Sequence, residues 1–371
     1  MMGTNKTSPF VTDLFRAAAP KTGNAVLAPH SVALVLGMIA LGARGETQRA
    51  LLRALHLESV SDLQNSIAAD EASFRAARKN GFRYESDVSV WARKGLRILR
   101  KYGRDAKHFF GASSREIDMG ESGRKEINAY VSKVTHGLIP TLLQEPLPDY
   151  CQLVATSALW LKAEWLNPFD PEETGNNLFH TQDGDVDIPF LCQVDDYMCF
   201  RSALFDSVFI PYKGDLLDFV IILPRNGLSP NQLIRENSSN MLAALHDFAQ
   251  HPSWEFLLLS APKLSIIFRS SLAEPLKAMG AEIAFSRNAD LSGIADAPEP
   301  IMISDVIHNV RLDLDEKGTE AAAATAAVCE ASGPPLCPTP FCVDRPFLFL
   351  VRHRKTGAIL FIGRVENPAT T

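Results

Sequence analysis

The amino-acid sequence predicts a mixed α/β protein of the α+β type, in which helices come first and a largely antiparallel set of strands follows. Apolar residues early in the chain recur at three- and four-residue spacing, as in amphipathic helices. Later segments carry short apolar runs that are either continuous or alternate with polar residues, as in strands. Helices followed by runs of strands are typical of the α+β class.

The helical part of the prediction depends on two segments. Residues 32–55 carry an apolar stripe at helical spacing, formed by Val32, Val35, Leu36 and Ile39. Ser31 precedes this stripe and is predicted to be its N-cap, while Gly42 and Gly45 are predicted to divide the segment into two helices. Residues 125–143 form another amphipathic pattern, which meets a glycine and a proline near its end.

The strand part depends on four patterns. Residues 153–165 are a long apolar run, which predicts a strand covered on both faces, and residues 219–224 are a shorter one. Residues 302–315 alternate between apolar and polar side chains, and residues 347–351 and 358–362 flank the turn of a predicted hairpin. In the alternating strand, one face is predicted to carry Val306, His308, Val310, Leu312 and Leu314, and the other Asp305, Asn309, Arg311, Asp313 and Asp315.

The composition describes an ordinary globular protein. The chain has 371 residues, of which 46% are hydrophobic and 22% are charged, with a net charge of −6. These values exclude disorder, collagen and coiled coil. Because no linker or internal repeat divides the chain, we expect residues 1–371 to form a single domain. No apolar run approaches the roughly 20 residues that span a bilayer. The N-terminus lacks the apolar core of a signal peptide, so the protein is expected in the cytoplasm, or outside the cell if a signal has been removed.

Local motifs favour neither an enzyme nor a metal site. The sequence contains no G-x-S-x-G, H-E-x-x-H or G-x-x-x-x-G-K-[ST] motif, and its histidines do not cluster at metal-ligand spacing. The six cysteines are too few to staple so long a chain, and none form a CxxC pair. Cys329, Cys337 and Cys342 could form a disulfide or a redox switch, or remain free thiols. We therefore expect no metal and no cofactor.

One segment, residues 316–342, fits neither a helix nor a strand. Its alanine run favours a helix by propensity, yet it has no apolar stripe that could pack against a core. The run continues into a proline-containing stretch without periodicity, and too few residues follow it for a second domain. A structureless stretch of this length in a compact protein is usually functional or a linker. The sequence therefore predicts an exposed loop here.

The loop begins with a motif that resembles the hinge of inhibitory serpins. This motif consists of Glu316, Lys317, Gly318, Thr319, Glu320, Ala321, Ala322, Ala323, Ala324 and Thr325. Further segments resemble serpin motifs in the expected order, at residues 24–31, 41–47, 127–131, 161–165, 211–214, 221–224, 289–294, 306–308, 345–349 and 360–365. Because the resemblance covers residues 8–368, the sequence is identified as a member of this family.

The resemblance implies a serpin fold, with a helical bundle, a large central sheet, smaller sheets and an exposed reactive-centre loop. It also implies that a target protease cleaves the loop and is trapped as an acyl-enzyme when the loop inserts into the central sheet. The hinge residues suit insertion, because alternate side chains from Thr319 onward are small enough to enter a packed interior. The expected partner is a protease in a covalent complex, and the inhibitor is expected to be a monomer.

The resemblance also implies a position for the reactive bond. Counting forward from Glu316 by the hinge length usual in the family places the bond between Ser332 and Gly333, which favours an elastase-like protease with a shallow pocket. The runner-up is Leu336 followed by Cys337, which would suit a chymotrypsin-like protease. A papain-like cysteine protease as target, or a non-inhibitory serpin that acts as a chaperone or carrier, remain alternatives.

Two other groups of residues are candidates for function. The resemblance implies that Ser31, Ser157, Trp165 and His308 belong to the region where the central sheet opens. Ala28 and Ser157 stand where serine and asparagine are usual, so we expect a thinner hydrogen-bond network there. A basic segment contains Arg93, Lys94, Arg97, Arg100, Lys101, Arg104 and Lys107 against a single acid, Asp105. It could bind a polyanion such as heparin, or it could be a solvated helix face.

Overall fold

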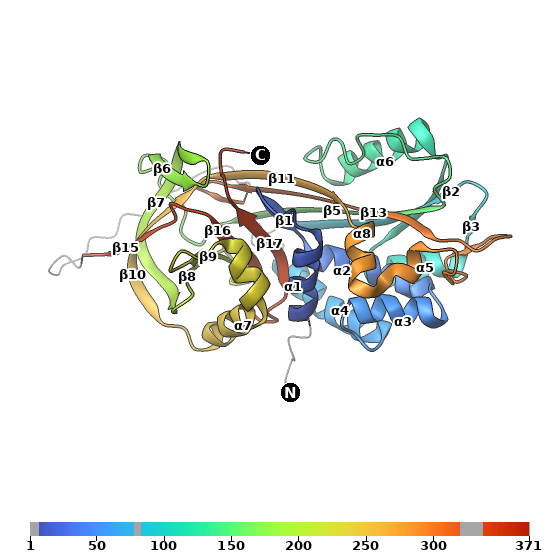
Figure 1. The fold of residues 1–371 in the computed structure, drawn as a ribbon, viewed down its shortest axis with the longest axis horizontal. Helices are drawn as coiled ribbons and strands as arrows, with labels where there is room; N and C mark the ends of the chain where they lie inside the picture. The colour runs from blue at the N-terminus through green and yellow to red at the C-terminus, as the bar shows by residue number, and fades with distance from the viewer. Residues whose placement is uncertain (1–6, 78–82, 320–336, 371) are drawn as a thin grey trace.

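Two large sheets form the framework of the computed structural model, which describes residues 7–77, 83–319 and 337–370 (Figure 1). The six-stranded sheet has the order β11-β13-β5-β2-β4, with β14 beside β5. The nine-stranded sheet has the order β1-β17-β16-β9-β8-β7-β10-β15, with β6 beside β7. A small sheet pairs β12 with β3. The predicted mixed α/β (α+β) class is confirmed.

The bounds of the elements are as follows. The α-helices are α1 (Thr7–Ala18), α2 (Pro29–Gly42), α3 (Gly45–Ala54), α4 (Val60–Ala77), α5 (Arg100–Phe110), α6 (Gly120–Val134), α7 (Pro230–Gln250) and α8 (Ala273–Leu276), and α8 is followed by a π-helical turn, Lys277–Ala281, and a 3-10 turn, Glu282–Phe285. The six-stranded sheet contains β2 (Arg83–Arg93), β4 (Ser113–Ile117), β5 (Leu153–Glu164), β11 (Leu264–Ser271), β13 (Ile303–Leu314) and β14 (Gly318–Thr319). The nine-stranded sheet contains β1 (Ala25–Leu27), β6 (Gly175–Thr181), β7 (Gly184–Arg201), β8 (Phe205–Pro211), β9 (Leu217–Pro224), β10 (Trp254–Pro262), β15 (Thr339–Cys342), β16 (Phe347–His353) and β17 (Ile359–Val365). The small sheet contains β3 (Arg97–Ile98) and β12 (Ala295–Asp296).

Three apolar clusters hold these layers together. Helices α1 to α5 pack beneath one end of the six-stranded sheet, whereas α6 lies on its opposite face (Figure 1). The other end of the sheet packs against the nine-stranded sheet through residues such as Leu161, Leu312, Phe219 and Phe349. At the end below α6, the six-stranded sheet is therefore covered on both faces, which explains the apolar first half of β5.

The helical predictions are confirmed in part. The break between α2 and α3 falls between Gly42 and Gly45, as expected. Ser31 is not the N-cap, because α2 starts at Pro29, and proline is favoured in the first turn, where its missing N–H costs nothing. Instead, Ser31 is buried within the helix. The helix predicted for residues 125–143 is α6, which ends earlier, at Val134.

The strand predictions are also confirmed, with one correction. Strands β5, β9 and β13 and the β16–β17 hairpin occupy the predicted segments. Asn309, however, is fully buried although it was assigned to the polar face of β13. The reason is that α6 and its neighbours cover that face of the sheet, which a strand pattern alone does not reveal. No helix in the described part of the chain is long and apolar enough to span a membrane.

Candidate functional site

The candidate site is the point where the hinge leaves β13 and folds back against β5. Strand β13 runs parallel to β5, and their ladder ends at the pair Val310 and Leu159. Beyond that pair, β5 bonds to β14 instead, with Gly318 opposite Glu164 and Thr319 opposite Ala163. This second pairing is antiparallel. The start of the hinge therefore lies in the sheet as a short strand of its own.

A tight turn produces this reversal of the chain. The Asp315 carboxylate accepts hydrogen bonds from the backbone N–H groups of Lys317, at 2.9 Å, and Gly318, at 3.1 Å. The backbone N–H of Asp315 donates to the Gly318 carbonyl at 2.9 Å. Gly318 has φ 148°, and a Cβ atom on it would lie 2.1 Å from the Ala163 carbonyl oxygen. Only glycine fits this position without a shift of the backbone.

Thr319 is the first hinge side chain that enters the interior. It is only 2% exposed, and its hydroxyl lies 2.7 Å from the hydroxyl of Tyr212. The Tyr212 ring stacks on Trp165 at a centroid distance of 4.5 Å. The Trp165 indole N–H donates to the Asp315 carbonyl at 2.9 Å. The aromatic pair thus connects the turn to the buried hydroxyl.

Glu316 anchors the base of the hinge. Its carboxylate accepts hydrogen bonds from Lys263 at 2.8 and 2.9 Å and from Thr174 at 3.0 Å. Its carbonyl accepts one from the Phe169 N–H at 2.7 Å. Burial alone would raise the pKa of Glu316, but the hydrogen bonds, led by that from Lys263, outweigh it and lower the pKa. The charged form of Glu316 is therefore favoured at this site.

The prediction of an exposed loop from Glu316 to Cys342 is wrong at both ends. Gly318 and Thr319 are buried in the six-stranded sheet, because β14 satisfies backbone groups of β5 beyond Leu159. At the other end, Thr339–Cys342 forms β15, which pairs in parallel with β10. Cys337 is exposed. The remaining predicted hinge residues and reactive-bond residues, namely Glu320, Ala321, Ala322, Ala323, Ala324, Thr325, Ser332, Gly333 and Leu336, lie outside the described residues.

Three of the four residues predicted for the sheet-opening region form one buried cluster. The hydroxyls of Ser31 and Ser157 lie 2.6 Å apart, and His308 Nδ1 lies 3.1 Å from the Ser157 hydroxyl. His308 and Ser157 are directly opposite each other on β13 and β5. The cluster therefore joins the two central strands to α2. Trp165, the fourth residue, lies at the far end of β5 in the hinge site described above.

The protonation state of His308 follows from its contacts. The backbone N–H of Ala28 donates to His308 Nε2 at 3.0 Å, so Nε2 carries no proton. Nδ1 must then carry it and donate to Ser157. Burial lowers the pKa of His308 to about 3, so the ring is neutral across the physiological range.

Sequence reasoning missed three residues of the hinge site. Tyr212 lies in a segment that resembled a family motif, but that resemblance assigned it no role. Asp315 was assigned only to the polar face of a strand. Lys263 is 53 positions from its partner Glu316, and no local pattern signals such a pairing.

The basic segment is less positive than its sequence suggested. Lys94 pairs with Asp118 at 2.5 Å, Arg97 with Asp296 at 2.8 Å, and Lys101 with Asp105 at 3.0 Å. The fold therefore supplies two acids from outside the segment. Arg93 lies at the end of β2. The remaining cations, Arg100, Arg104 and Lys107, are exposed on one face of α5, at positions four and three residues apart.

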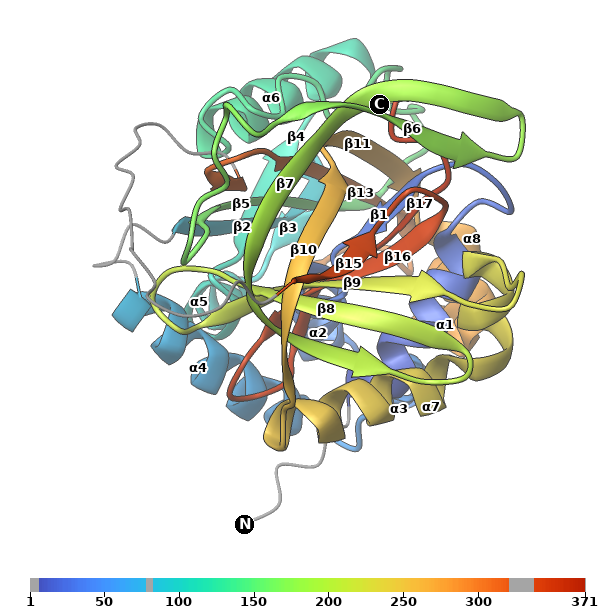
Figure 2. The same ribbon diagram turned by 90° about the vertical axis from the view of Figure 1, so that its left-hand side faces the viewer.

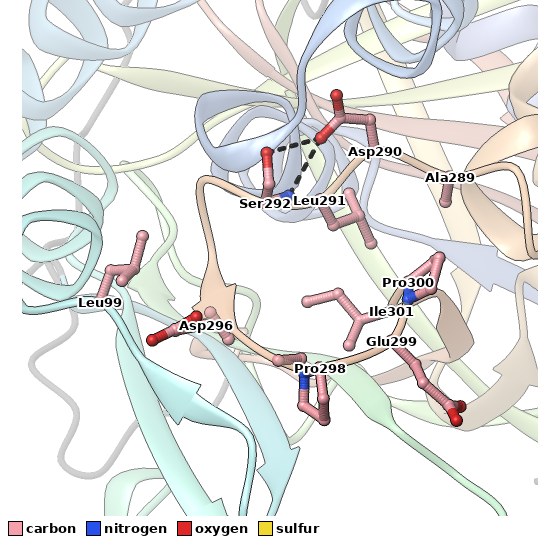
Figure 3. A pocket seen from close by; sticks show the side chains of 12 residues that line it. Leu99, Ala289, Asp290, Leu291, Ser292, Asp296, Pro298, Glu299, Pro300 and Ile301 are labelled. Carbon is pink, nitrogen blue, oxygen red and sulfur yellow. Dashed lines mark hydrogen bonds between the residues drawn. The ribbon is translucent and has the colours of Figure 1, made fainter.

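A pocket of about 430 Å³ lies next to the start of α5 (Figure 3). Its charged lining residues are Asp290, Asp296 and Glu299, and Asp290 accepts hydrogen bonds from the N–H and hydroxyl of Ser292. The pocket also contains apolar side chains, including Leu99 and Ile301. Because its charges are negative, this pocket does not extend the basic surface of α5.

Comparison with known proteins assigns this architecture to one class of protein. Residues 5–368 match the family described as serpin (serine protease inhibitor). The chain therefore belongs to the serpin family. An uncharacterised serpin-like protein of Thermococcus kodakarensis is 30% identical over 98% of this chain and 85% of its own length.

Two further relatives are informative. The leukocyte elastase inhibitor of Sus scrofa is 29% identical over 97% of each chain. The solved structure of native protease nexin-1 with heparin is 26% identical, covers 99% of this chain and 98% of its own, and superimposes with a TM-score of 0.83. The family thus includes inhibitors of proteases, and the fold of this chain is the serpin fold.

Proposed function

We propose that this protein is an irreversible suicide-type inhibitor of serine proteases. The protease would cleave within residues 320–336, or just after them, and form an ester with the bait residue. Insertion of the freed loop into the six-stranded sheet would then carry the protease away before it hydrolyses that ester. The observation that carries this proposal is the antiparallel pairing of Gly318 and Thr319 with β5.

That pairing supplies the direction and the starting point for insertion. A strand that continues from Thr319 in the direction of β14 would pass along β5 toward Leu159 and Ser157. It would separate β5 from β13 and replace their parallel ladder with two antiparallel ones, which are slightly more stable per residue. The turn at Asp315 and Gly318 is already made, so no further reversal of the chain is needed.

The cluster of Ser31, Ser157 and His308 stands in the path of such a strand. His308 and Ser157 are cross-strand neighbours, so their hydrogen bond must break when the strands separate. A buried hydrogen bond of this kind contributes about 1 kcal/mol. The cluster therefore acts as a latch, which slows insertion until cleavage frees the loop.

The bait sequence supports a target with a shallow pocket. A bond between Ser332 and Gly333 presents only small side chains, as an elastase-like protease requires, and the similarity to leukocyte elastase inhibitors agrees with this choice. The alternative bond, after Leu336, would suit a chymotrypsin-like protease. A papain-like cysteine protease is a further alternative. A non-inhibitory carrier would be cleaved without forming a complex.

The test is incubation with elastase-like, chymotrypsin-like, trypsin-like and papain-like proteases, followed by denaturing gel electrophoresis. We expect a complex of summed mass with an elastase-like or chymotrypsin-like protease, and none when the protease is inactivated beforehand. Mass spectrometry of the released fragment distinguishes the two bonds, because it begins at Gly333 or at Cys337. Cleavage by every protease without any complex would contradict the proposal.

A second proposal concerns the basic face of α5. Arg100, Arg104 and Lys107 lie along one exposed face, and the related protease nexin-1 was solved with heparin. We propose that this face binds a polyanion such as heparin. Retention on immobilised heparin should fall when all three are changed to serine. The triple change Arg49→Ser, Arg53→Ser and Lys277→Ser, which removes three partly exposed cations elsewhere, is the control.

A further inference from the structure

An apolar surface lies on the outward side of β10 and its neighbours. Trp254, Phe256 and Leu258 are 56%, 36% and 40% exposed, at alternate positions that share one face of the strand. Val194 on β7, which is 48% exposed, lies directly opposite Leu258. These four residues form what we call the β10 apolar face. They account for four of the ten large exposed hydrophobic residues in the described part of the chain.

The grouping of these exposed apolar side chains on one face indicates a binding surface. Single exposed apolar residues are normal on a protein surface, but contiguous ones mark interaction sites. On the other side of β10, Leu258 pairs with Pro340 of β15, which extends the apolar surface by one strand. Figure 2 shows β7, β10 and β15 side by side on the face turned toward the viewer.

The register of β15 places this surface next to the reactive loop. Because β15 runs parallel to β10, with Thr339 beside Leu257, the chain that leads into Thr339 comes from the end of β10 that holds Phe256 and Trp254. Either candidate bond is within six residues of Thr339, and six residues span at most about 20 Å. A protease domain is roughly 40 Å across. A protease bound at either bond is therefore close enough to reach the β10 apolar face.

The residues at the border of this surface indicate which side chain a partner would place there. A hollow of about 260 Å³ opens between Trp254, Leu166 and Pro211, and it is also lined by Asp195 and Asp196. Apolar walls and carboxylates together suit an arginine or lysine side chain, whose stem is apolar and whose end is positive. Asp196 also stands directly opposite Phe256, within the apolar surface itself.

We propose that the β10 apolar face is a second contact surface for the target protease, separate from the bait. The complementary surface on the protease carries apolar side chains and at least one arginine or lysine beside its substrate cleft. This inference rests on the proposed inhibitory function. The bait residue determines which proteases can bind it, because it must fit their specificity pocket. The β10 apolar face increases the rate at which such a protease associates.

The test compares association rate constants for the protease that forms the covalent complex. We expect the double variant Trp254→Ser and Phe256→Ser to associate at least tenfold more slowly. Its stoichiometry of inhibition should be unchanged, because hinge and bait are intact. The matched control, Leu178→Ser and Ile267→Ser, removes two exposed apolar residues of β6 and β11 and should change the rate less than twofold.

A charge variant tests the border. Asp196→Asn should lower the association rate and weaken its dependence on ionic strength, because the variant removes an attraction between opposite charges.

Melting temperatures establish that each variant is folded. If the wild-type protein traps the protease and the double variant associates as fast as the control, the inference is wrong while the inhibitory function stands. If the wild-type protein traps no protease, the proposed function itself fails. A wild-type dimer in sedimentation that the double variant abolishes, with no change in rate, would assign the surface to a second copy of the chain and overturn the proposal.

Discussion

The hydroxyl groups of Tyr212 and Thr319 lie 2.7 Å apart in the interior of the protein. Through this contact, the stacked rings of Tyr212 and Trp165 hold the first buried side chain of the hinge, which lies 107 positions after Tyr212 in the sequence. In the proposed mechanism, the strand that insertion would lengthen is therefore present before any protease acts. The remaining hinge would extend a strand that exists, and need not start a new one.

Tyr212→Phe should lower the free energy of unfolding by about 1 kcal/mol, because the Thr319 hydroxyl loses its buried partner while the stack on Trp165 is kept. Denaturant unfolding measures this change. Tyr150→Phe is the control, because Tyr150 is 75% exposed, and it should have no effect. Equal losses in both variants would mean that the contact does not stabilise the hinge.

Thr319→Arg should convert the inhibitor into a substrate. A guanidinium at a position that is 2% exposed would be buried without a partner, at a cost of several kcal/mol. The native variant would avoid this cost by releasing the two-residue strand β14 from the sheet, but an inserted strand could not, so insertion would lose its race with deacylation. The measurement is the molar ratio of inhibitor to protease needed for complete inhibition, which should rise steeply. Thr319→Ser retains the hydroxyl and should leave the ratio near that of the wild type. An unchanged ratio for the arginine variant would show that the strand formed after cleavage does not keep residue 319 buried.

Gly318→Ala should disrupt the chain reversal. The new Cβ would meet the Ala163 carbonyl oxygen at 2.1 Å, and φ 148° is itself strained for alanine. We expect a loss of roughly 2 kcal/mol in stability and slower trapping of protease. Gly184→Ala separates the two causes, because Gly184 also has a positive φ, of 126°, but has open space around it. Similar effects on trapping in both variants would show that the close approach to Ala163 is unimportant.

Cleavage of the loop should stabilise the protein strongly. Insertion adds a central strand with new ladder hydrogen bonds and buries the small side chains of the hinge. Calorimetry before and after limited proteolysis between residues 320 and 336 should show a large rise in melting temperature. The Thr319→Arg variant, cleaved in the same way, should show little or no rise. A wild-type protein that melts at the same temperature before and after cleavage would exclude the inhibitory mechanism.

His308 should make the stability of the native protein depend on pH. Its pKa is lowered by burial to about 3, from about 6.5 in the unfolded chain. Its contribution is therefore fully present above pH 6.5 and is lost as pH falls toward 3, with a slope of at most about 1.4 kcal/mol per pH unit. Asp218 works in the opposite direction, because burial raises its pKa to about 6. The informative quantity is thus the difference between wild type and His308→Gln in denaturant unfolding from pH 7 to pH 4. A difference that does not change with pH would contradict the neutral, buried imidazole.

The sequence determined the order and type of the main elements, and the family to which the chain belongs. Periodicity located α2, α3, β5, β9, β13 and the β16–β17 hairpin, because spacing along the chain directly reflects which faces of an element are buried. The small residues and the glycine of the hinge were also visible in the sequence. These are local properties, and each can be read from a few neighbouring residues.

Only the tertiary structure decided which groups meet. Ser31 was expected to cap a helix, yet it bonds to Ser157, 126 positions away, because Pro29 starts the helix and the sheet covers α2. Asn309 was expected on a polar face, yet α6 covers that face. Thr319 was expected in an exposed loop, yet β5 offers it backbone partners beyond the end of its ladder with β13. In each case a long-range hydrogen bond or a packed layer overrode the local pattern, and no spacing within one segment encodes what packs against it.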